Sequence, residues 1–569
     1  MASEELLQIQ LEEVKKMETN GDKKLRGGYY TPNEIARFIT KWVITKESNN
    51  ILEPSCGDGQ FIESAIEILS SLGINKRTIP NKIIGVELNA IEAKKSSERF
   101  TKYLLDGEES IIEGDFFANC HKWLDNQKEF DSIIGNPPFI RYQDFPEKFK
   151  TSALDLMKRA NLKPNKLMNT WIPFVVGSTL LLRSGGRIGF VLPAELFQVN
   201  YASEIRKFLS DSYSKVIIIT FRKLVFANIQ QEVVLFLGEK NGRKSHGINI
   251  IEMESTESLK DTDLNKKNID ETLKVLDSST EKWTQYFLSE KEVKLLRKLK
   301  INSEIGLTGS YMSVDVGIVT GQNNYFVLNK DRLKEHGLEN QSQKIFSKSI
   351  QLKGIVATNE DFKQSAQRIN SNYLVNIPDT EYKHLPKYLQ KYIDIGEKEE
   401  VHKGYKCRIR KNWWVIPSLW KPDAFMLRQV HNYPKIILNS CQATNTDTIH
   451  RIKFMDGVNG EIIASAFLNS LTLAFSEVTG RSYGGGVLTF EPTEAENLPL
   501  PLEGAEHLNF QKIDALIRKG EIEKVLDITD KILLKDGLNL SDSEIKSLRT
   551  IWKKLRDRRL YRKRNYDLS

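Results

Sequence analysis

Four residues in a row, Asn136, Pro137, Pro138 and Phe139, have the types and order needed to hold an amino group. The two prolines fix backbone φ angles and carry no N–H, so the segment presents the Asn136 amide oxygen and backbone carbonyls as acceptors in a rigid arc. Phe139 offers a face on which a planar ring can stack. Because an amine on an aromatic ring is a poor nucleophile, two acceptors would activate its nitrogen for direct attack on a methyl group. This chemistry requires no metal.

A second set of residues follows a strand-like run, in the stretch EPSCGDGQF that begins at Glu53. Gly57 and Gly59 let the backbone turn tightly and approach a ligand, and the free N–H groups of a following helix would face that ligand. The spacing is neither G-x-G-x-x-G nor that of a P-loop, which argues against a phosphate. Glu53 instead suits a ligand that carries positive charge.

Two more carboxylates stand at the ends of the next strand-like runs. Glu87 comes about 30 residues after the glycine turn, where a ribose diol lies in a nucleoside-binding α/β sheet, and Asp115 could accept from an exocyclic amine. Either residue alone is typical of a solvated strand end. The three carboxylates in order predict S-adenosylmethionine as the ligand, because it combines a sulfonium, an amino acid and an adenosine.

Residues 51–240 contain the elements that would position these groups. Seven short apolar runs alternate with helix-length intervals, which predicts an α/β fold with helices on both faces of a mixed, Rossmann-like sheet. A helix is predicted ahead of the sheet, with Thr31 as its N-cap and Pro32 in its first turn. The seven runs are ILEPSCGDG, KIIGVEL, SIIEGDFF, FDSIIGNPPF, GGRIGFVLP, KVIIITF and EVVLFLGE.

Composition divides the chain of 569 residues into four segments. We expect a catalytic domain over 1–245, a polar linker over 246–302, a separate α+β domain over 303–504 and a helical basic segment over 505–569. The acidic N-terminus does not resemble a signal peptide, and no apolar run is long enough to span a membrane. The four scattered cysteines fit a reducing cytoplasm.

The net charge of +8 is concentrated near the C-terminus. Residues 553–564, KKLRDRRLYRKR, contain eight basic residues and one acidic residue, a net +7 that leaves about +1 for the rest of the chain. Such a run suits either a DNA backbone or a solvated helix face. If it contacts DNA, its deletion should weaken DNA affinity and flatten the salt dependence.

The ordered set TPNEIARFI, EPSCGDGQF, GVEL, EGDFF, GNPPF and GGRIGFVLP resembles the gamma-class, TaqI-like N6-adenine DNA methyltransferases of restriction-modification systems. The resemblance extends over nearly the whole chain and is most specific at GNPPF and at the YYTP element. It implies transfer of a methyl group from S-adenosylmethionine to N6 of an adenine flipped out of duplex DNA.

The resemblance also implies roles for individual residues. Asn136 and Pro137 would hold the target amine, beside Pro138, and Phe139 and Phe226 would contact the two faces of the target base. The cofactor would be bound by Thr31, Glu53, Pro54, Ser55, Cys56, Gly57, Gly59, Glu87, Asp115, Phe116, Asn136 and Phe174. For Phe174 and Phe226, a place in the core is the alternative.

Residues 303–501 resemble the target-recognition domain of the same family, through DVGIVTGQNNYFVLN and GRSYGGGVLTFEPTEAENLPLP. Basic and aromatic residues alternate between these stretches, which suits phosphate contacts. The candidate DNA-binding residues are Arg408, Arg410, Lys411, Arg481, Lys553, Lys554, Arg558 and Arg559. The expected partner is double-stranded DNA with a specific recognition sequence, methylated by a monomer in the cytoplasm of a bacterium or archaeon, at the nucleoid. A cognate restriction endonuclease, if there is one, would be encoded separately.

Other functions use similar residues. A protein-glutamine N5-methyltransferase holds an amide in an NPPY loop, but such enzymes are shorter and lack a second domain of this length. An RNA adenine methyltransferase is the next alternative. A bifunctional restriction-modification chain would need a nuclease signature that we do not find, and an inactive specificity subunit would not explain an intact Asn136 loop.

Overall fold

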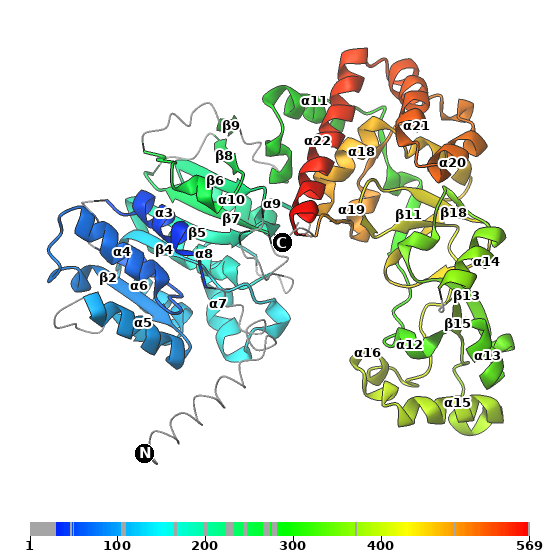
Figure 1. Ribbon diagram of the computed structural model, residues 1–569, viewed down its shortest axis with the longest axis horizontal. Coiled ribbons are helices and arrows are strands. Elements are labelled where there is room, and N and C mark those ends of the chain that lie inside the picture. The colour runs from blue at the N-terminus through cyan, green and yellow to red at the C-terminus, as the bar shows by residue number, and fades with distance from the viewer. Residues whose placement is uncertain are drawn as a thin grey trace. The chain divides into compact units, whose positions relative to one another are not determined.

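The computed structural model describes residues 30–45, 48, 50–103, 110–163, 168–198, 202–223, 225, 232–242, 247–265, 273–275, 282–369, 372–482 and 485–566. The chain divides into two compact units (Figure 1). Unit 1 comprises Met1–Phe287 together with Arg564–Ser569, and unit 2 comprises Leu288–Lys563.

Unit 1 is built on a nine-stranded sheet in the order β3-β2-β1-β4-β5-β7-β6-β8-β9. The first five strands of this order are parallel, whereas β7 is antiparallel to both of its neighbours. The predicted mixed α/β sheet is therefore confirmed, and each of the seven apolar runs contains a strand. The strands are β1 Ile51–Glu53, β2 Ile83–Glu87, β3 Ile111–Glu113, β4 Phe130–Gly135, β5 Leu182–Pro193, β6 Lys215–Phe221, β7 Val233–Glu239, β8 Gly247–Met253 and β9 Leu273–Val275.

Helices cover both faces of this sheet. Neighbouring residues of β4 show the two layers, because Ile133 belongs to the core under α6, α7 and α8 and Ile134 to the core under α3, α4 and α5. Burial on both faces explains why the parallel strands are almost continuously apolar. The helices are α3 Asn33–Val43, α4 Gln60–Ser71, α5 Ala90–Tyr103, α6 Phe116–Asp125, α7 Glu147–Arg159, α8 Trp171–Leu181, α9 Glu195–Gln198 and α10 Ser203–Ser212.

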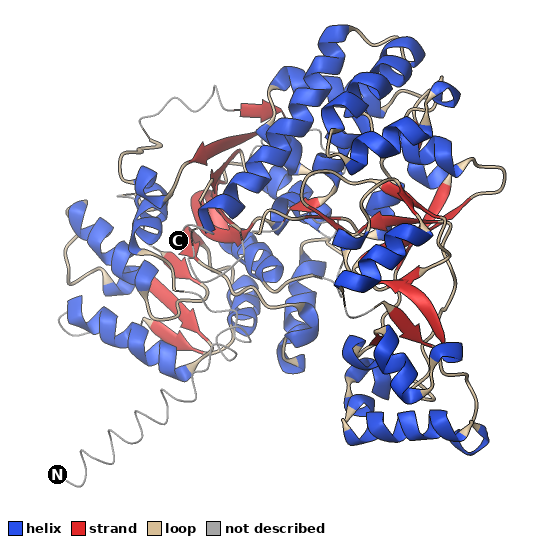
Figure 2. Ribbon diagram, turned by 45° about the vertical axis from the view of Figure 1, so that its right-hand side comes forward, coloured by secondary structure: helices blue, strands red, loops and turns tan. Residues whose placement is uncertain are grey.

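Unit 2 combines short strands in several small sheets with many helices, as Figure 2 shows. Its largest sheet has the order β11-β20-β16-β18-β14. The strands are β10 Gly306–Leu307, β11 Met312–Val316, β12 Val327–Leu328, β13 Ser342–Phe346, β14 Val356–Ala357, β15 Tyr373–Val375, β16 Ala424–Leu427, β17 Gln429–Val430, β18 Ile436–Asn439, β19 Thr444–Asn445, β20 Ile449–Phe454, β21 Arg481–Ser482, β22 Leu488–Thr489 and β23 Pro499–Leu500.

The helices of unit 2 include most of α22, the last helix that the structure describes. They are α11 Glu290–Lys300, α12 Asn323–Phe326, α13 Lys330–His336, α14 Asn359–Arg368, α15 Lys387–Lys398, α16 Tyr405–Arg408, α17 Gly460–Ala466, α18 Ser470–Thr479, α19 Pro492–Glu496, α20 Phe510–Arg518, α21 Ile522–Thr529 and α22 Asp542–Tyr566. A π-helical segment, Asp530–Gly537, follows α21.

The structure divides the chain differently from the sequence-based expectation of four segments. The expected linker, 246–302, contains β8, which pairs with β6 inside the sheet, and α11, which belongs to unit 2. The expected C-terminal segment, 505–569, begins with helices that share a core with Ile355 and Leu468 of the preceding segment. Both differences arise because apolar residues at these positions are buried against partners far away in the chain.

Within the described residues, no single helix has both the length and the apolar character needed to cross a membrane. The pair α17 and α18, bent by 77°, passes the same test only when its two helices are joined.

Candidate active site

The predicted site residues come together at the carboxyl ends of β1, β2 and β4. Strand β1 lies between β2 and β4, so the strand order reverses there, and such a switch point is where open α/β sheets bind their ligands. The turn after β1 leads into α4 through Gly59, whose φ is +88°. A side-chain carbon at Gly59 would lie 2.8 Å from Ser96 Oγ, so glycine is needed both for the turn and for the approach to α5.

Glu87, at the end of β2, is held by two backbone N–H groups. Gly57 N donates to Glu87 Oε2 at 2.9 Å, and Asn89 N donates to Glu87 Oε1 at 2.8 Å. Burial raises the pKa of Glu87. Asn89 is a structural residue of the site that sequence reasoning missed, although an Asn just before a helix is a common N-cap signal. Its Oδ1 accepts from the backbone of Ile91 and Glu92.

Glu53, at the end of β1, is almost completely buried, with 2% of its surface exposed. Its Oε2 has no hydrogen-bond partner among the residues that the structure describes. Burial, followed by the negative charges of Asp58 and Glu87, raises the pKa of Glu53 well above its ordinary value. A buried carboxylate with one unpaired oxygen is costly to ionise, and a cationic ligand would stabilise its ionised form.

Cys56 lies in the same turn, and its side chain is buried. Cys56 N donates to Val86 O at 2.9 Å, and its carbonyl accepts from Gly59 N at 2.8 Å. Burial raises the pKa of the thiol, which therefore stays protonated. Cys56 thus contributes the shape of the turn rather than a nucleophile.

Asn136 follows β4 and contacts residues from two other elements. Its Nδ2 donates to Thr31 Oγ1 at 3.1 Å, and its backbone carbonyl accepts from Ser55 Oγ at 3.4 Å. The expectation that Thr31 caps α3 is wrong, because the helix begins at Asn33 with Pro32 in the cap position and no side-chain cap. Thr31 instead orients the Asn136 amide. Pro54 also approaches this strand end, 3.5 Å from where a side-chain carbon of Gly135 would lie.

The loop that follows β4, residues 136–140, is also held in place by Thr170, which sequence reasoning did not select. Thr170 Oγ1 donates to Pro138 O at 2.6 Å and accepts from Ile140 N at 3.0 Å, and Thr170 N donates to Ile140 O at 2.9 Å. Pro137 is buried, while Phe139 is half-buried and packs against both cores of unit 1. No local pattern identifies Thr170, because its partners lie about 30 residues earlier in the chain.

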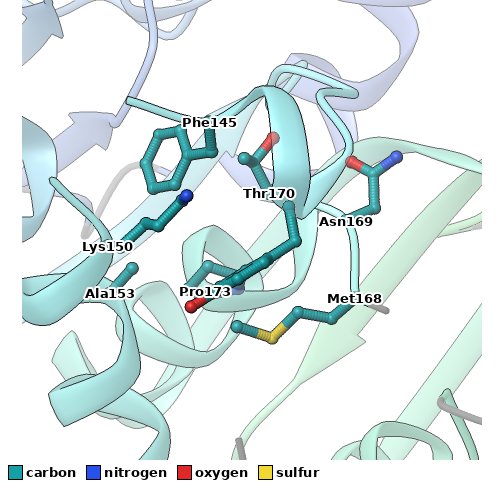
Figure 3. A pocket seen from close by; sticks show the side chains of 8 residues that line it. Phe145, Lys150, Ala153, Met168, Asn169, Thr170 and Pro173 are labelled. Carbon is teal, nitrogen blue, oxygen red and sulfur yellow. The ribbon is translucent and has the colours of Figure 1, made fainter. Parts of the chain in front are cut away.

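A small cavity lies next to Thr170, which forms part of its lining (Figure 3). Its volume of about 10 Å³ suits one water molecule rather than a nucleobase. Figure 3 shows Thr170 and Pro173 at the start of α8 on one side and Lys150 and Ala153 of α7 on the other. The loop therefore rests on closely packed side chains.

Three further predicted cofactor residues lie at the start of α6 and on α8. Asp115 caps α6, because its carboxylate accepts from Phe117 N and Ala118 N, each at 3.1 Å. Burial raises its pKa. The Phe116 and Phe174 rings stack on one another, with centroids 5.0 Å apart, inside the core. This packing favours the core alternative for Phe174. Phe226 lies outside the described residues.

Some of the candidate DNA-binding side chains are exposed, and others form hydrogen bonds or ion pairs within the protein. Arg408 and Lys411 are exposed on unit 2. Arg410 instead holds the chain internally, because its guanidinium donates to Val319 O and Thr320 O, each at 2.8 Å, and to Trp413 O. Arg481 is ion-paired with the buried carboxylate of Glu494 at 3.1 Å.

Three cations of the basic segment 553–564 are ion-paired inside unit 2. Lys553 pairs with Glu523, and Lys554 pairs with Glu292. Arg559 is buried and forms a doubly hydrogen-bonded ion pair with the buried Glu477, at 2.7 and 3.1 Å. Arg558 is half-buried. The assignment of Arg559 to the DNA backbone is therefore wrong, because its charge is used to join α22 to α18.

Two family models match the chain. The model described as N-6 DNA Methylase matches residues 11–305, more than half of the chain. The model described as Type II methyltransferase M.Eco57I, C-terminal domain, matches residues 280–534.

Related proteins and solved structures extend this result. The chain is 22% identical to the Type II methyltransferase M.AccI of Acinetobacter calcoaceticus over 82% of this chain and 83% of that protein. It is 29% identical to M.HincII of Haemophilus influenzae over 42% of each chain. The solved structure of the Type IIL restriction-modification enzyme MmeI in complex with DNA matches 92% of this chain and 75% of that one, with a TM-score of 0.58 and 13% identity. That likeness concerns the fold.

Proposed function

Because this chain belongs to the N-6 DNA methylase family, we propose that Asn136 and Pro137 present the acceptors for the adenine amine at the switch point of unit 1. The protein is a DNA adenine methyltransferase of the restriction-modification type that uses S-adenosylmethionine. The observation that carries the residue assignment is the contact of Asn136 with Thr31 and Ser55, beside the carboxylates of β1 and β2. Its membership of the gamma class stays a prediction.

The residues of the site fit the cofactor. The Glu53 oxygen that lacks a partner among the described residues lies in the turn, where a cationic amino acid or sulfonium would compensate its charge. Glu87 is held by two N–H groups, so its carboxylate is already oriented to accept from a ribose diol. Asp115 caps α6, and each of its oxygens keeps a second lone pair for an adenine amine.

Bound S-adenosylmethionine supplies a methyl group on a sulfonium, a leaving group that departs as a neutral thioether. We propose direct in-line transfer. The N6 lone pair of adenine forms the new C–N bond while the electrons of the C–S bond move to sulfur, and the nitrogen then releases one proton to water. Asn136 and Pro137 accept from the amine. Thr31 holds the Asn136 amide, and Thr170 holds the carbonyl of Pro138, which follows these acceptors.

An adenine inside a duplex cannot reach such acceptors, so the proposal includes rotation of the base out of the helix. The half-buried ring of Phe139, next to the acceptors, would stack on the extruded base. Rotation should raise the fluorescence of a 2-aminopurine placed at the target position. An unchanged fluorescence in a complex that still methylates DNA would contradict base rotation.

We further propose that unit 2 selects the DNA sequence, because the family model of its C-terminal domain matches most of it. The protein would act as a monomer, in the cytoplasm, where host DNA lies. A cognate endonuclease would be a separate chain, since M.AccI, matched over most of its length, is named only as a methyltransferase. Sedimentation of the protein with DNA tests the first point, and a DNA-cleavage assay tests the second.

The Asn136→Ala variant tests the catalytic assignment. We expect methyl transfer from labelled S-adenosylmethionine to unmethylated genomic DNA to fall by at least about a hundredfold, as when other transition-state hydrogen bonds are lost. Cofactor affinity, measured by calorimetry, should stay near that of the wild type. A loss of cofactor binding as large as that of Glu87→Ala would mean that the loop holds the cofactor instead of the base.

Matched reactions distinguish the alternatives. Asn75→Ala, an exposed position of unit 1 outside the site, is the control for asparagine removal and should leave transfer unchanged. Transcribed RNA and a release-factor protein replace DNA in parallel reactions. Label in protein alone would support a glutamine methyltransferase, and label in RNA alone an RNA methyltransferase.

A further inference from the structure

Lys553, Lys554 and Arg559 of α22 are ion-paired within unit 2, so these three cations are less available for DNA than exposed cations elsewhere in the unit. Outside α22, residues 403–411, KGYKCRIRK, are the strongest candidate for a DNA-contacting surface of unit 2. They contain five basic residues and no acidic residue. Among the described residues, Lys406, Arg408 and Lys411 form no ion pair, and all three are exposed. Their charge is therefore directed at the solvent.

Two large apolar side chains stand among these charges. Tyr405 is 64% exposed and Ile409 is 60% exposed. Lys406 Nζ lies 5.5 Å from the centre of the Tyr405 ring. An isolated exposed apolar residue needs no explanation, but two of them beside three exposed cations that form no ion pair among the described residues are the combination that binds a polyanion with planar, stackable groups.

A loop with amide side chains packs against this helix. Gly321 has a φ of +87°, and a side-chain carbon there would lie 3.0 Å from both Lys406 Cβ and Cys407 Sγ. Arg410 fastens the loop by donating to the carbonyls of Val319 and Thr320. Only glycine allows this close approach and this conformation. Figure 1 shows α12, which begins in the loop, beside α16.

The loop and the helix thus form one exposed ridge, which we define as residues 321–324 with 405–411. Gln322, Asn323 and Asn324 are all exposed, and Thr320 Oγ1 donates to Asn323 Oδ1 at 2.6 Å, which fixes that amide. Glutamine and asparagine amides can pair with both the N6 and N7 edges of adenine in the major groove, whereas lysine and arginine contact phosphates.

We propose that this ridge is the duplex-DNA docking surface of unit 2. Its cations contact the phosphate backbone, Tyr405 and Ile409 contact sugars or bases, and the amides of residues 322–324 reach base edges. The inference rests on the proposed role of unit 2 in sequence selection. It places the sequence-reading contacts on a short loop and helix, whose positions are fixed by Gly321 and Arg410.

The test is a triple variant, Lys406→Ala, Arg408→Ala and Lys411→Ala. Binding to a fluorescent 30-base-pair duplex should weaken by at least about tenfold at 0.15 M salt, and the slope of log affinity against log salt should fall by about two to three. The matched control removes three exposed lysines elsewhere in unit 2, Lys512→Ala, Lys519→Ala and Lys531→Ala. The control should bind DNA and methylate it like the wild type.

The amides and the aromatic ring are tested separately. Gln322→Ala and Asn324→Ala should change which sequence is methylated, as read by methylation sequencing of host DNA. They should leave the salt slope of DNA binding nearly unchanged. Tyr405→Ala should weaken DNA binding, whereas Tyr405→Phe, which keeps the ring, should bind DNA like the wild type.

Two outcomes would overturn the ridge without affecting the proposed function. The first is a triple variant that binds DNA with the affinity and salt slope of the control. The second is a triple variant that changes only the sedimentation of the protein, which would make the ridge an interface between copies. If the wild-type protein fails to methylate DNA at all, the proposed function itself is wrong.

Discussion

At the residue scale, the two carboxylates nearest the cofactor turn are satisfied in different ways. Glu87 accepts two backbone hydrogen bonds, whereas Glu53 is buried with one oxygen that has no partner among the described residues. Burial raises the pKa of both side chains, and for Glu53 the negative charges of Asp58 and Glu87 act in the same direction as burial. The ionised form of Glu53 is thus unfavourable until a cation compensates it.

The Glu53→Gln variant should separate stability from cofactor binding. The folded pKa of Glu53 is raised above its ordinary 4.5, so its ionisation destabilises the cofactor-free protein increasingly as pH rises through that raised value. We therefore expect Glu53→Gln to melt at a higher temperature than the wild type at pH 8 and to lose this advantage near pH 4. Thermal unfolding without cofactor at several pH values measures the effect.

The same variant should bind S-adenosylmethionine at least about tenfold more weakly at pH 8, because a charged contact is replaced by a neutral one. Wild-type affinity should fall as pH is lowered through the raised pKa of Glu53, and the affinity of Glu53→Gln should depend less on pH. Equal pH dependence in the two proteins would show that Glu53 does not face the positive charge.

At the element scale, the loop of residues 136–140, which we propose to be catalytic, depends on the start of α8. Thr170 bridges the loop through both its side chain and its backbone, to Pro138 and Ile140. Thr170 is a positioning residue, since it contacts the loop and not the reacting groups. Its hydroxyl is buried, so removal leaves a backbone donor and an acceptor without a partner.

Thr170→Val should lower kcat by about tenfold or more while leaving the Kd for the cofactor and for DNA near the wild-type values, because only the geometry of the acceptors changes. Thr170→Ser keeps the hydroxyl and should restore the rate. Thr179→Val, which removes another buried and hydrogen-bonded threonine from α8, controls for lost stability. A similar fall in kcat for Thr179→Val would mean that Thr170 affects the rate only by stabilising the fold.

At the scale of the whole molecule, α22 is an internal support of unit 2. Leu548, Ile551, Trp552 and Leu555 are buried, and Arg559 joins the helix to Glu477. The deletion of residues 553–564 would therefore remove part of the core. A weaker DNA affinity in that truncation could not be assigned to lost phosphate contacts.

Arg559→Ala should destabilise unit 2 by about 3–5 kcal/mol, because it leaves the Glu477 carboxylate buried without its partner. Lys554→Ala removes a partly exposed pair with Glu292 and should cost less than about 1 kcal/mol. Urea denaturation followed by circular dichroism measures both. Under conditions in which Arg559→Ala is folded, the salt slope of its DNA binding should equal that of the wild type. A smaller slope would mean that Arg559 contacts DNA.

The sequence by itself determined the chemistry of the site and the type of fold. Glu53, the glycine turn, Glu87 and Asn136 each follow an apolar strand run directly, so local order was enough to place them at one edge of a parallel sheet. Strands β8 and β9 were missed because polar segments surround them.

Only the tertiary structure decided which side chains hold others in place and which basic residues reach the solvent. Thr31 lies 105 positions before Asn136, and Arg559 lies 82 positions after Glu477. Local sequence shows a charge but not the distant partner that neutralises it. For this reason residues 553–564 resembled a DNA-binding tail, although Arg559 is buried in an ion pair. Lys406, Arg408 and Lys411, in contrast, are exposed and form no ion pair among the described residues. Burial and ion pairing depend on contacts between distant segments, and these exist only after the chain has folded.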